Sequence, residues 1–293
     1  MRLWTPSMFF TVMLAGACGG ESDGDDGPDG GNSDEWQPLV TLDWALEAPG
    51  GAEEPEGYVC KTYTVPEDMI ITGFRTIAPP GTHHAVLSVG EVDREDSEFN
   101  CYFADGKEIG LVGSGYGSDD FNLPEGVGLQ ISAGQQLFLN LHVFNASDGE
   151  LTGTSGIAIK TAETVETLAE NTAAAAVSLD IEPGTGQTQE TTCTIKEEGT
   201  IVYWWPHMHQ LGRRMTVRLN DQVVLDEPYS FTEQVYYPGE TAIHAGDTLT
   251  ITCTYDNDTG DTVHFGESTN DEMCLLAFWR YPATGEAYCD LPF

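Results

Sequence analysis

Positive charge is scarce in this 293-residue sequence, which has 11 lysine and arginine residues against 48 aspartate and glutamate residues. The formal net charge at pH 7 is −37. A surface of this sign repels nucleic acid and anionic lipid headgroups. We therefore expect no nucleic-acid partner. We attach no further function to the charge, because an acidic surface also serves solubility.

Long amphipathic periodicity is also missing, and a single stretch, TAETVETLAENTAAAA at residues 161–176, favours a helix. Elsewhere, short runs of Val, Ile, Thr, Tyr and Phe alternate with turn residues, as in TLTITCTYDNDTGD. This alternation is typical of all-β sandwiches or barrels. A chain of this length can form one large domain or two medium domains, each with its own core.

The first 18 residues, MRLWTPSMFFTVMLAGAC, predict a targeting segment that is too short and too early for a spanning helix. The LAGAC pattern resembles a bacterial lipoprotein signal, which is cleaved before a lipidated cysteine. It departs from the usual form because Leu14 lies four residues before Cys18 instead of three. We expect an exported lipoprotein anchored to a membrane through Cys18, in the periplasm or at the cell surface. An ordinary export signal is the alternative.

Residues 19–35, GGESDGDDGPDGGNSDE, have almost no apolar content and cannot form a core. They predict a disordered acidic tether. Folded structure should begin near Trp36.

No CxxC spacing occurs in the sequence, which disfavours a cysteine-ligated metal. Besides Cys18 there are six cysteines: Cys60, Cys101, Cys193, Cys253, Cys274 and Cys289. An even number in an exported chain favours three disulfides. Six cysteines allow 15 pairings, and parity alone does not choose among them.

Histidine is rare as well, and five of the seven histidines fall in three short motifs, PGTHHAVL, LFLNLHVFN and PHMHQLG. Residues His207 and His209 are two apart, so on a strand both side chains point to one face. Residues His83 and His84 are adjacent and diverge on a regular strand, so a shared metal requires a twist or a strand end. We expect His142 to join them from a neighbouring strand.

The pair His207 and His209 is incomplete as a metal site. Met273 lies beside Cys274, where a polar stretch turns into an apolar one. A methionine in such a place is usually core filling. Its thioether is nevertheless a soft ligand suited to Cu(I), and imidazole suits copper in either state. Two histidines and a methionine would form an open, soft copper site.

The motifs THHAVL, LHVFN, HMHQLGRR and GESTNDEMC, in this order, resemble the type II copper, ascorbate-dependent monooxygenases. This family includes peptidylglycine α-hydroxylating monooxygenase and dopamine β-monooxygenase. The resemblance runs from about Tyr58 to Cys289. It implies an all-β fold with two jelly-roll-like antiparallel β-sandwich domains, residues 36–165 and 166–293, that face each other across a solvent-filled cleft.

The resemblance also implies one copper in each domain. By motif, His83, His84 and His142 look like ligands of an electron-transfer copper. The residues His207, His209 and Met273 look like ligands of an oxygen-activating copper and form the catalytic centre. The implied cysteine pairs are Cys60–Cys101, Cys193–Cys289 and Cys253–Cys274. The implied reaction is hydroxylation of a C–H bond with O2 and a one-electron reductant such as ascorbate.

Three departures from the peptide-amidating enzyme concern the substrate. That enzyme carries an Arg, an Asn and a Tyr where this chain carries Trp205, Leu275 and Ala277. A substrate carboxylate finds no donor at these apolar positions. We therefore expect a small apolar or aromatic substrate. Arg213 and Arg214 lie just beyond the HxH motif and offer an anion contact or, as we favour, a strand-edge role.

Several neighbours of the motifs have open roles. We expect His264 to be structural or to support a ligand near Met273, and His244 to lie in a surface loop. Asp271 and Glu272 either hydrogen-bond a ligating imidazole or form a solvated turn.

The sequence thus predicts a monomeric copper monooxygenase whose partners are O2 and a small molecule. A non-catalytic copper-binding or electron-transfer lipoprotein is the alternative from another class, and a purely structural surface lipoprotein is a third. Oxygen consumption coupled to ascorbate separates the enzyme from a copper binder.

Overall fold

We describe the chain from a computed structural model. The described residues are 33–48, 56–90, 95–101, 109–114, 119–231, 233, 235–266 and 270–289. All regular elements in these ranges are strands, which confirms the all-β prediction. They contain no helix long and apolar enough to cross a membrane. The predicted signal segment and nearly all of the predicted tether lie outside these residues.

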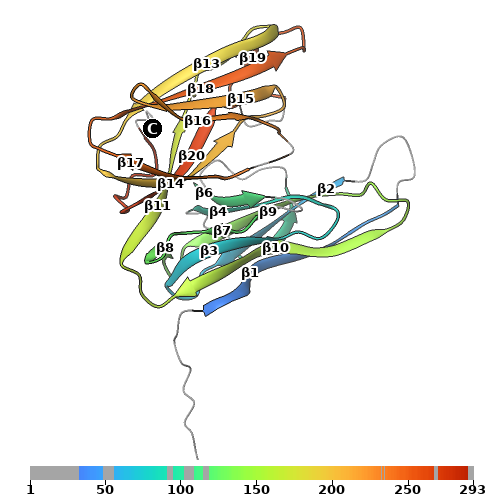
Figure 1. Cartoon of the computed structure of the whole chain (residues 1–293). Coiled ribbons are helices and arrows are strands. Elements are labelled where there is room, and N and C mark those ends of the chain that lie inside the picture. Colours follow the sequence, from blue (N-terminus) through green and yellow to red (C-terminus); the bar gives the residue numbers. More distant parts are fainter. Residues whose placement is uncertain are drawn as a thin grey trace, which may run out of the picture. The chain divides into compact units, whose positions relative to one another are not determined.

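The N-terminal part of the chain forms two layers of antiparallel strands (Figure 1). One layer contains, in sheet order, β1 (Ser33–Leu46), β10 (Leu151–Ala162), β3 (Met69–Ile77) and β8 (Val127–Ile131), with β7 (Phe121–Asn122) beside β3. The other layer contains, in sheet order, β5 (Glu98–Asn100), β2 (Glu56–Thr64), β9 (Gln136–Phe144), β4 (Thr82–Gly90) and β6 (Ile109–Ser114). The first strand begins at Ser33, three residues before the predicted start.

The C-terminal part repeats the two-layer plan (Figure 1). One layer contains β11 (Thr167–Ala175), β20 (Leu275–Tyr281), β14 (Gly199–His207) and β17 (Tyr237–Ile243). The other contains β13 (Gly184–Thr194), β18 (Thr248–Asn257), β15 (Gly212–Leu219) and β16 (Gln222–Pro228). Two short strands, β12 (Asp180–Ile181) and β19 (Val263–His264), pair with each other in a separate two-stranded sheet.

A parallel pairing joins the sheets of the two parts. β11 pairs with β8 from Thr167↔Val127 to Ala169↔Leu129, and on its other edge it pairs with β20. The predicted domain boundary at residue 165 falls between the end of β10 and the start of β11. Residues 31–293 form one compact unit, and the boundary itself stays a prediction.

The helix-prone stretch at residues 161–176 forms the end of β10 and all of β11. Its alanines Ala173, Ala174 and Ala175 are buried, and alternate residues meet different apolar clusters. Pairing on both edges and burial on both faces outweigh the weak helical preference of alanine and glutamate.

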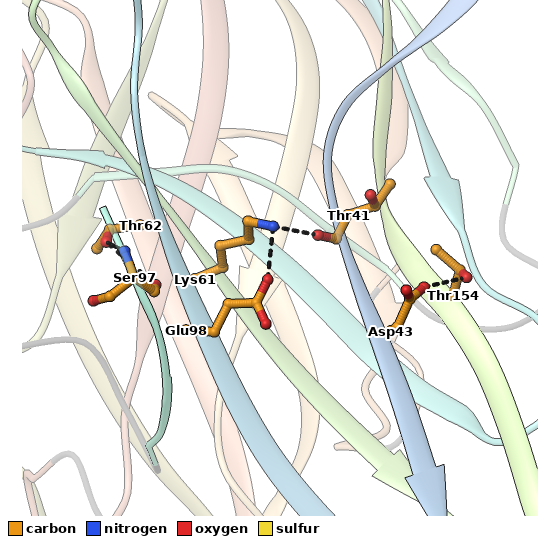
Figure 2. Close-up of polar contacts among 7 residues, drawn as sticks. All are labelled: Thr41, Asp43, Lys61, Thr62, Ser97, Glu98 and Thr154. Carbon is orange, nitrogen blue, oxygen red and sulfur yellow. Dashed lines mark hydrogen bonds and ion pairs between the residues drawn. The ribbon is translucent and has the colours of Figure 1, made fainter. Parts of the chain in front are cut away.

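Polar contacts fasten β1 to the neighbouring layer (Figure 2). Lys61 on β2 donates from Nζ to the carbonyl oxygen of Thr41, at 3.0 Å, and to Glu98 Oε1, at 2.8 Å. Thr154 on β10 donates to Asp43 Oδ1 at 2.6 Å. The Lys61 bond links β1 to the other layer, and the Thr154 bond links it to β10 in its own layer.

Three disulfides cross-link the strands, with the pairing that the resemblance implies. Cys60–Cys101 lies in the N-terminal part, and Cys193–Cys289 and Cys253–Cys274 lie in the C-terminal part. The last of these ties β18 to the segment that precedes β20, and Cys253 and Cys274 are completely buried.

The turns that follow β9 and β18 are built alike. Asn145 Oδ1 accepts from the backbone N–H and the hydroxyl of Ser147, at 2.9 and 2.7 Å. Asn257 Oδ1 accepts from the same groups of Thr259, at 3.0 and 2.8 Å. Both asparagines are buried. The two turns therefore share one local hydrogen-bonding pattern.

Candidate metal centres

Three of the predicted ligands meet where β4 begins beside β9. His84 lies opposite His142 in the antiparallel register, and the register shifts between Thr82 and His84. The extra residue in this β-bulge is His83. A bulge re-aims a side chain that would otherwise point to the opposite face. Donor atoms of the three histidines consequently lie within 4.8 Å of one another.

The hydrogen bonds of this three-histidine cluster leave one buried imidazole nitrogen without a partner among the described residues. Nδ1 of His83 and Nδ1 of His84 are 3.1 Å apart. Glu56 Oε2 lies 3.0 Å from Nε2 of His142, whose ring stacks on Tyr58 at a centroid distance of 4.0 Å. Nδ1 of His142 is buried, and no described residue gives it a hydrogen-bond partner. A buried, orphaned imidazole nitrogen beside two others fits a metal ion.

Burial keeps these imidazoles neutral. Desolvation lowers the pKa of His83 and of His142, and in both cases nearby Glu56 partly opposes the effect. Desolvation lowers the pKa of His84 to about 3, with smaller contributions from the neighbouring histidines, His207 among them. Neutral imidazole is the form that binds a metal. The cluster is thus ready for a cation without first losing protons at neutral pH.

The second group of histidines, His207 and His209, lies at the end of β14 and just after it. His207 is the last residue of β14, and His209 lies in the turn before β15. The sequence predicted that one strand would place both side chains on one face, and this is wrong because the strand ends at His207. The turn nevertheless brings the rings together, with centroids 5.4 Å apart and planes at 87°.

The carboxylate of Glu272 holds this turn by accepting hydrogen bonds from its backbone N–H groups. Its Oε2 accepts from the N–H groups of His209, at 2.9 Å, and Met273, at 3.2 Å. Its Oε1 accepts from the N–H of Leu211 at 2.6 Å. The residue is completely buried, and desolvation raises its pKa while these bonds oppose the rise. The sequence offered an imidazole contact or a solvated turn, and the structure shows neither.

The orientation of His209 comes from Asp271. Nδ1 of His209 donates to the backbone carbonyl of Asp271 at 3.0 Å, which leaves Nε2 as the nitrogen available to a metal. The predicted imidazole contact of Asp271 thus exists, but through its carbonyl instead of its carboxylate. Such partners fix the tautomer and the ring orientation of a metal-binding histidine.

The same contacts bring the Met273 backbone against the His209 turn. Met273 is half-buried, and its carbonyl oxygen accepts from the hydroxyl of Tyr255 at 2.7 Å. The adjacent Cys274 is tied to Cys253. Residue 273 is thereby fixed on both sides, next to the turn that carries the second histidine pair.

Comparison with protein families decides what this arrangement belongs to. Residues 165–292 match the family model described as copper type II ascorbate-dependent monooxygenase, C-terminal domain. This match supports the copper monooxygenase family for the C-terminal part of the chain. The match includes His207, His209 and Met273, while the three-histidine cluster lies outside the matched residues.

Solved structures add no argument to this family assignment. Matches include a structure of allantoicase, with 11% identity, 83% of this chain and 84% of that chain covered, and a TM-score of 0.24. Allantoicase from Saccharomyces cerevisiae is 11% identical, with 84% of this chain and 84% of that chain covered and a TM-score of 0.26. The structure of infectious bursal disease virus Gt strain is 13% identical, with 88% of this chain and 78% of that chain covered and a TM-score of 0.18. These TM-scores are too low to indicate a shared fold.

The residues predicted to contact substrate in this copper monooxygenase domain lie on one face of β14 and β20. Trp205 pairs with Ala277, and His207 pairs with Leu275. Trp205 and Ala277 are buried in an apolar cluster with residues of the N-terminal sandwich, and Leu275 packs against it. Here the two sandwiches touch, and the solvent-filled cleft that the resemblance implies stays a prediction. Substrate contact by these residues stays a prediction.

Glycine makes this contact possible. A Cβ atom added to Gly113 of β6 would lie 3.0 Å from Trp205 Cζ2 and 2.9 Å from Val86 Cγ2. One added to Gly110 would lie 3.2 Å from Trp205 Cζ3. The indole thus fills a space that is open only because these two positions lack side chains.

The remaining histidines stay outside the two clusters, as the sequence predicted. His264 Nδ1 lies 2.8 Å from Asp180 Oδ1, and both side chains are exposed. Its carbonyl oxygen accepts from the N–H of Glu272 at 3.0 Å, a structural role next to the His209 turn. His244 is exposed in a turn beside Asp247.

Arg213 and Arg214 have acidic and carbonyl partners. Arg213 Nε lies 3.2 Å from Asp256 Oδ2, and Arg214 Nη1 lies 2.8 Å from Asp226 Oδ1. Both belong to β15, which lies between β18 and β16, so these pairs join neighbouring strands within the sheet and do not lie at its edge as the sequence favoured.

Proposed function

We propose that this protein is a copper-dependent monooxygenase that hydroxylates a C–H bond of a small apolar or aromatic substrate. The co-substrates are O2 and a one-electron reductant such as ascorbate. One oxygen atom enters the C–H bond and the other leaves as water, so each turnover consumes two electrons and two protons. The observation that carries the proposal is the family match of residues 165–292 together with two histidine clusters in one chain.

We assign the first metal to the cluster of His83, His84 and His142. Its donor atoms lie within 4.8 Å of one another, and the orphaned Nδ1 of His142 has Glu56 behind its other nitrogen. Three imidazoles suit copper in both oxidation states. This site has the role of receiving and passing single electrons.

We assign the second metal to His207, His209 and Met273. Nδ1 of His209 is engaged by the Asp271 carbonyl, which directs Nε2 to the ligand position. A thioether stabilises Cu(I), and three protein ligands leave a coordination position for O2. Copper would supply the one-electron chemistry that lets O2 react with a C–H bond. The chain would hold the ligands, orient them and exclude water.

We further propose that the mature protein is an exported monomer anchored through a lipid on Cys18. The targeting segment and the acidic tether of the sequence support this location. Three disulfides in the folded part agree with an oxidising compartment.

A copper-binding or electron-transfer protein without oxygenase activity is the second candidate. It is favoured by the burial of Trp205 and Ala277, at 7% and 4% exposure, where a substrate was expected. Such a protein would bind copper at the same residues and would pass electrons without consuming O2.

Oxygen uptake separates these candidates. The copper-loaded full chain is mixed with ascorbate, and O2 consumption is followed with and without a panel of small aromatic and aliphatic compounds. The monooxygenase proposal predicts uptake that depends on copper and rises with one compound class, with a hydroxylated product found by mass spectrometry. Reduction of the bound copper by ascorbate, with neither sustained O2 uptake nor a hydroxylated product, would support the second candidate instead.

A further inference from the structure

Glu272 is a fully buried acidic residue whose carboxylate has neither a lysine nor an arginine among its hydrogen-bond donors. Its donors are three backbone N–H groups, those of His209, Leu211 and Met273, at 2.9, 2.6 and 3.2 Å. Burying a carboxylate is costly unless hydrogen bonds compensate for the lost water. A short polar or apolar side chain would avoid that cost. Retaining the carboxylate here therefore points to a task.

The three donors come from the two segments that carry the proposed ligands of the second metal. His209 and Leu211 belong to the turn between β14 and β15, and Met273 belongs to the segment before β20. Neither segment is in a strand at these residues, because the β14–β20 ladder ends at the pair His207↔Leu275. Beyond that end, the Glu272 carboxylate, on the Met273 segment, links that segment to the His209 turn through one oxygen that accepts from both. Hydrogen bonds from N–H to an ionised acceptor are about twice as strong as neutral ones.

We propose that Glu272 is a positioning residue that holds the His209 turn and the Met273 segment at the separation that a metal requires. It does so through backbone N–H groups and without touching the metal. This inference rests on the proposed function, since it takes His209 and Met273 as ligands. The separation of the two ligand-bearing segments in the second site is thus set by one side chain that is not itself a ligand.

Two variants of Glu272 test the clamp. Glu272→Gln keeps the shape but turns an NH2 group toward a backbone N–H, so two donors face each other. Glu272→Asp keeps the charge but is one methylene too short to reach both segments. The matched control is Glu170→Gln, because Glu170 accepts from the Thr284 hydroxyl and the Gly285 N–H, each at 2.7 Å. Glu170 lies opposite Arg280, toward the far end of β20.

The measurement is X-ray absorption at the copper edge on Cu(I)-loaded full chain, with copper content and melting temperature taken on the same samples. The inference predicts that both Glu272 variants lose most of the copper–sulfur scattering seen in the unchanged protein. Their affinity for the second copper should fall about 10- to 100-fold, the range for residues that orient metal ligands. The first copper should be retained. Glu170→Gln should keep the sulfur scattering even if its melting temperature falls.

If Glu272 had a purely structural role, its variants would have a lower melting temperature and unchanged copper–sulfur scattering. That result would overturn the inference. Absence of sulfur scattering in the unchanged protein would instead refute the ligand role of Met273 and thus the proposed function. Hydrogen exchange on the metal-free, unchanged chain needs no variant. The amides of His209, Leu211 and Met273 should be protected before copper is added, and rapid exchange there would contradict a preformed clamp.

Discussion

At the scale of the residue, a substitution at Met273 distinguishes a metal ligand from a side chain that only fills the core. We expect Met273→Leu to change the free energy of unfolding by less than about 1.5 kcal/mol, because volume and apolarity are kept. The same change removes the proposed sulfur ligand, so ascorbate-driven O2 uptake should collapse while the three-histidine cluster still binds copper. Oxygen electrode traces and thermal melts on this variant check both expectations. Normal uptake with normal melting would show that Met273 is not a ligand.

Glu56 has a comparable role at the first cluster, since its carboxylate engages Nε2 of His142 at 3.0 Å. We expect Glu56→Ala to weaken the first copper about 10- to 100-fold by freeing the ring to rotate. Competition with a copper chelator gives the affinity of each site. The matched control is Glu98→Ala, which removes another exposed carboxylate of this layer, paired with Lys61. Equal copper affinity in the two variants would exclude an orienting role for Glu56.

The gathering of the histidines into two groups was predictable from the sequence, because histidines are few and fall in ordered motifs. The clamp at Glu272 was not. An acidic pair in a polar stretch such as GESTNDE has the same local pattern whether it faces water or is buried. What decides is the approach of the turn at His209, 63 positions away in the sequence, and local patterns carry no record of that contact.

At the scale of the element, the disulfide between Cys253 and Cys274 connects β18 to the segment that carries Met273. The paired change Cys253→Ala and Cys274→Ala opens a loop with a sequence separation of 21 residues. We expect a loss of about 3 kcal/mol of unfolding free energy in the loop-entropy model, measured by urea denaturation. The second copper should weaken along with it.

The control for this prediction is the Cys60–Cys101 disulfide, whose sequence separation of 41 implies a loss of similar size, about 4 kcal/mol. Its removal should destabilise the protein and leave the second copper in place. If both paired changes reduced the second copper to the same extent, the disulfide at Cys274 would have no local effect on the site.

Two features of the strands show what sequence periodicity can predict and what it cannot. The sequence required a twist or a strand end for His83 and His84 to share a metal, and the register shift at the start of β4 provides it. The shift itself was not predictable, because it depends on how β4 pairs with β9. The helix-prone stretch became β11 for the same kind of reason, since its two edges pair with β8 and β20.

At the scale of the whole molecule, the contact between the two sandwiches depends on Gly113. We expect Gly113→Ala to cost about 1–3 kcal/mol of unfolding free energy, because the added methyl group collides with Val86 and Trp205. Gly149→Ala is the matched control, because an added Cβ there meets nothing within 4 Å. Urea denaturation of both variants gives the difference. Two equal free energies would mean that the indole of Trp205 is not packed against β6.

The central claim is that one chain carries two distinct copper sites, and copper content after saturation and desalting tests it most directly. The full chain should retain two copper ions. His84→Ala should retain one, whose X-ray absorption includes sulfur scattering, because the second site is intact. A single copper in the unchanged protein, or zinc retained against excess copper, would contradict the two-site account.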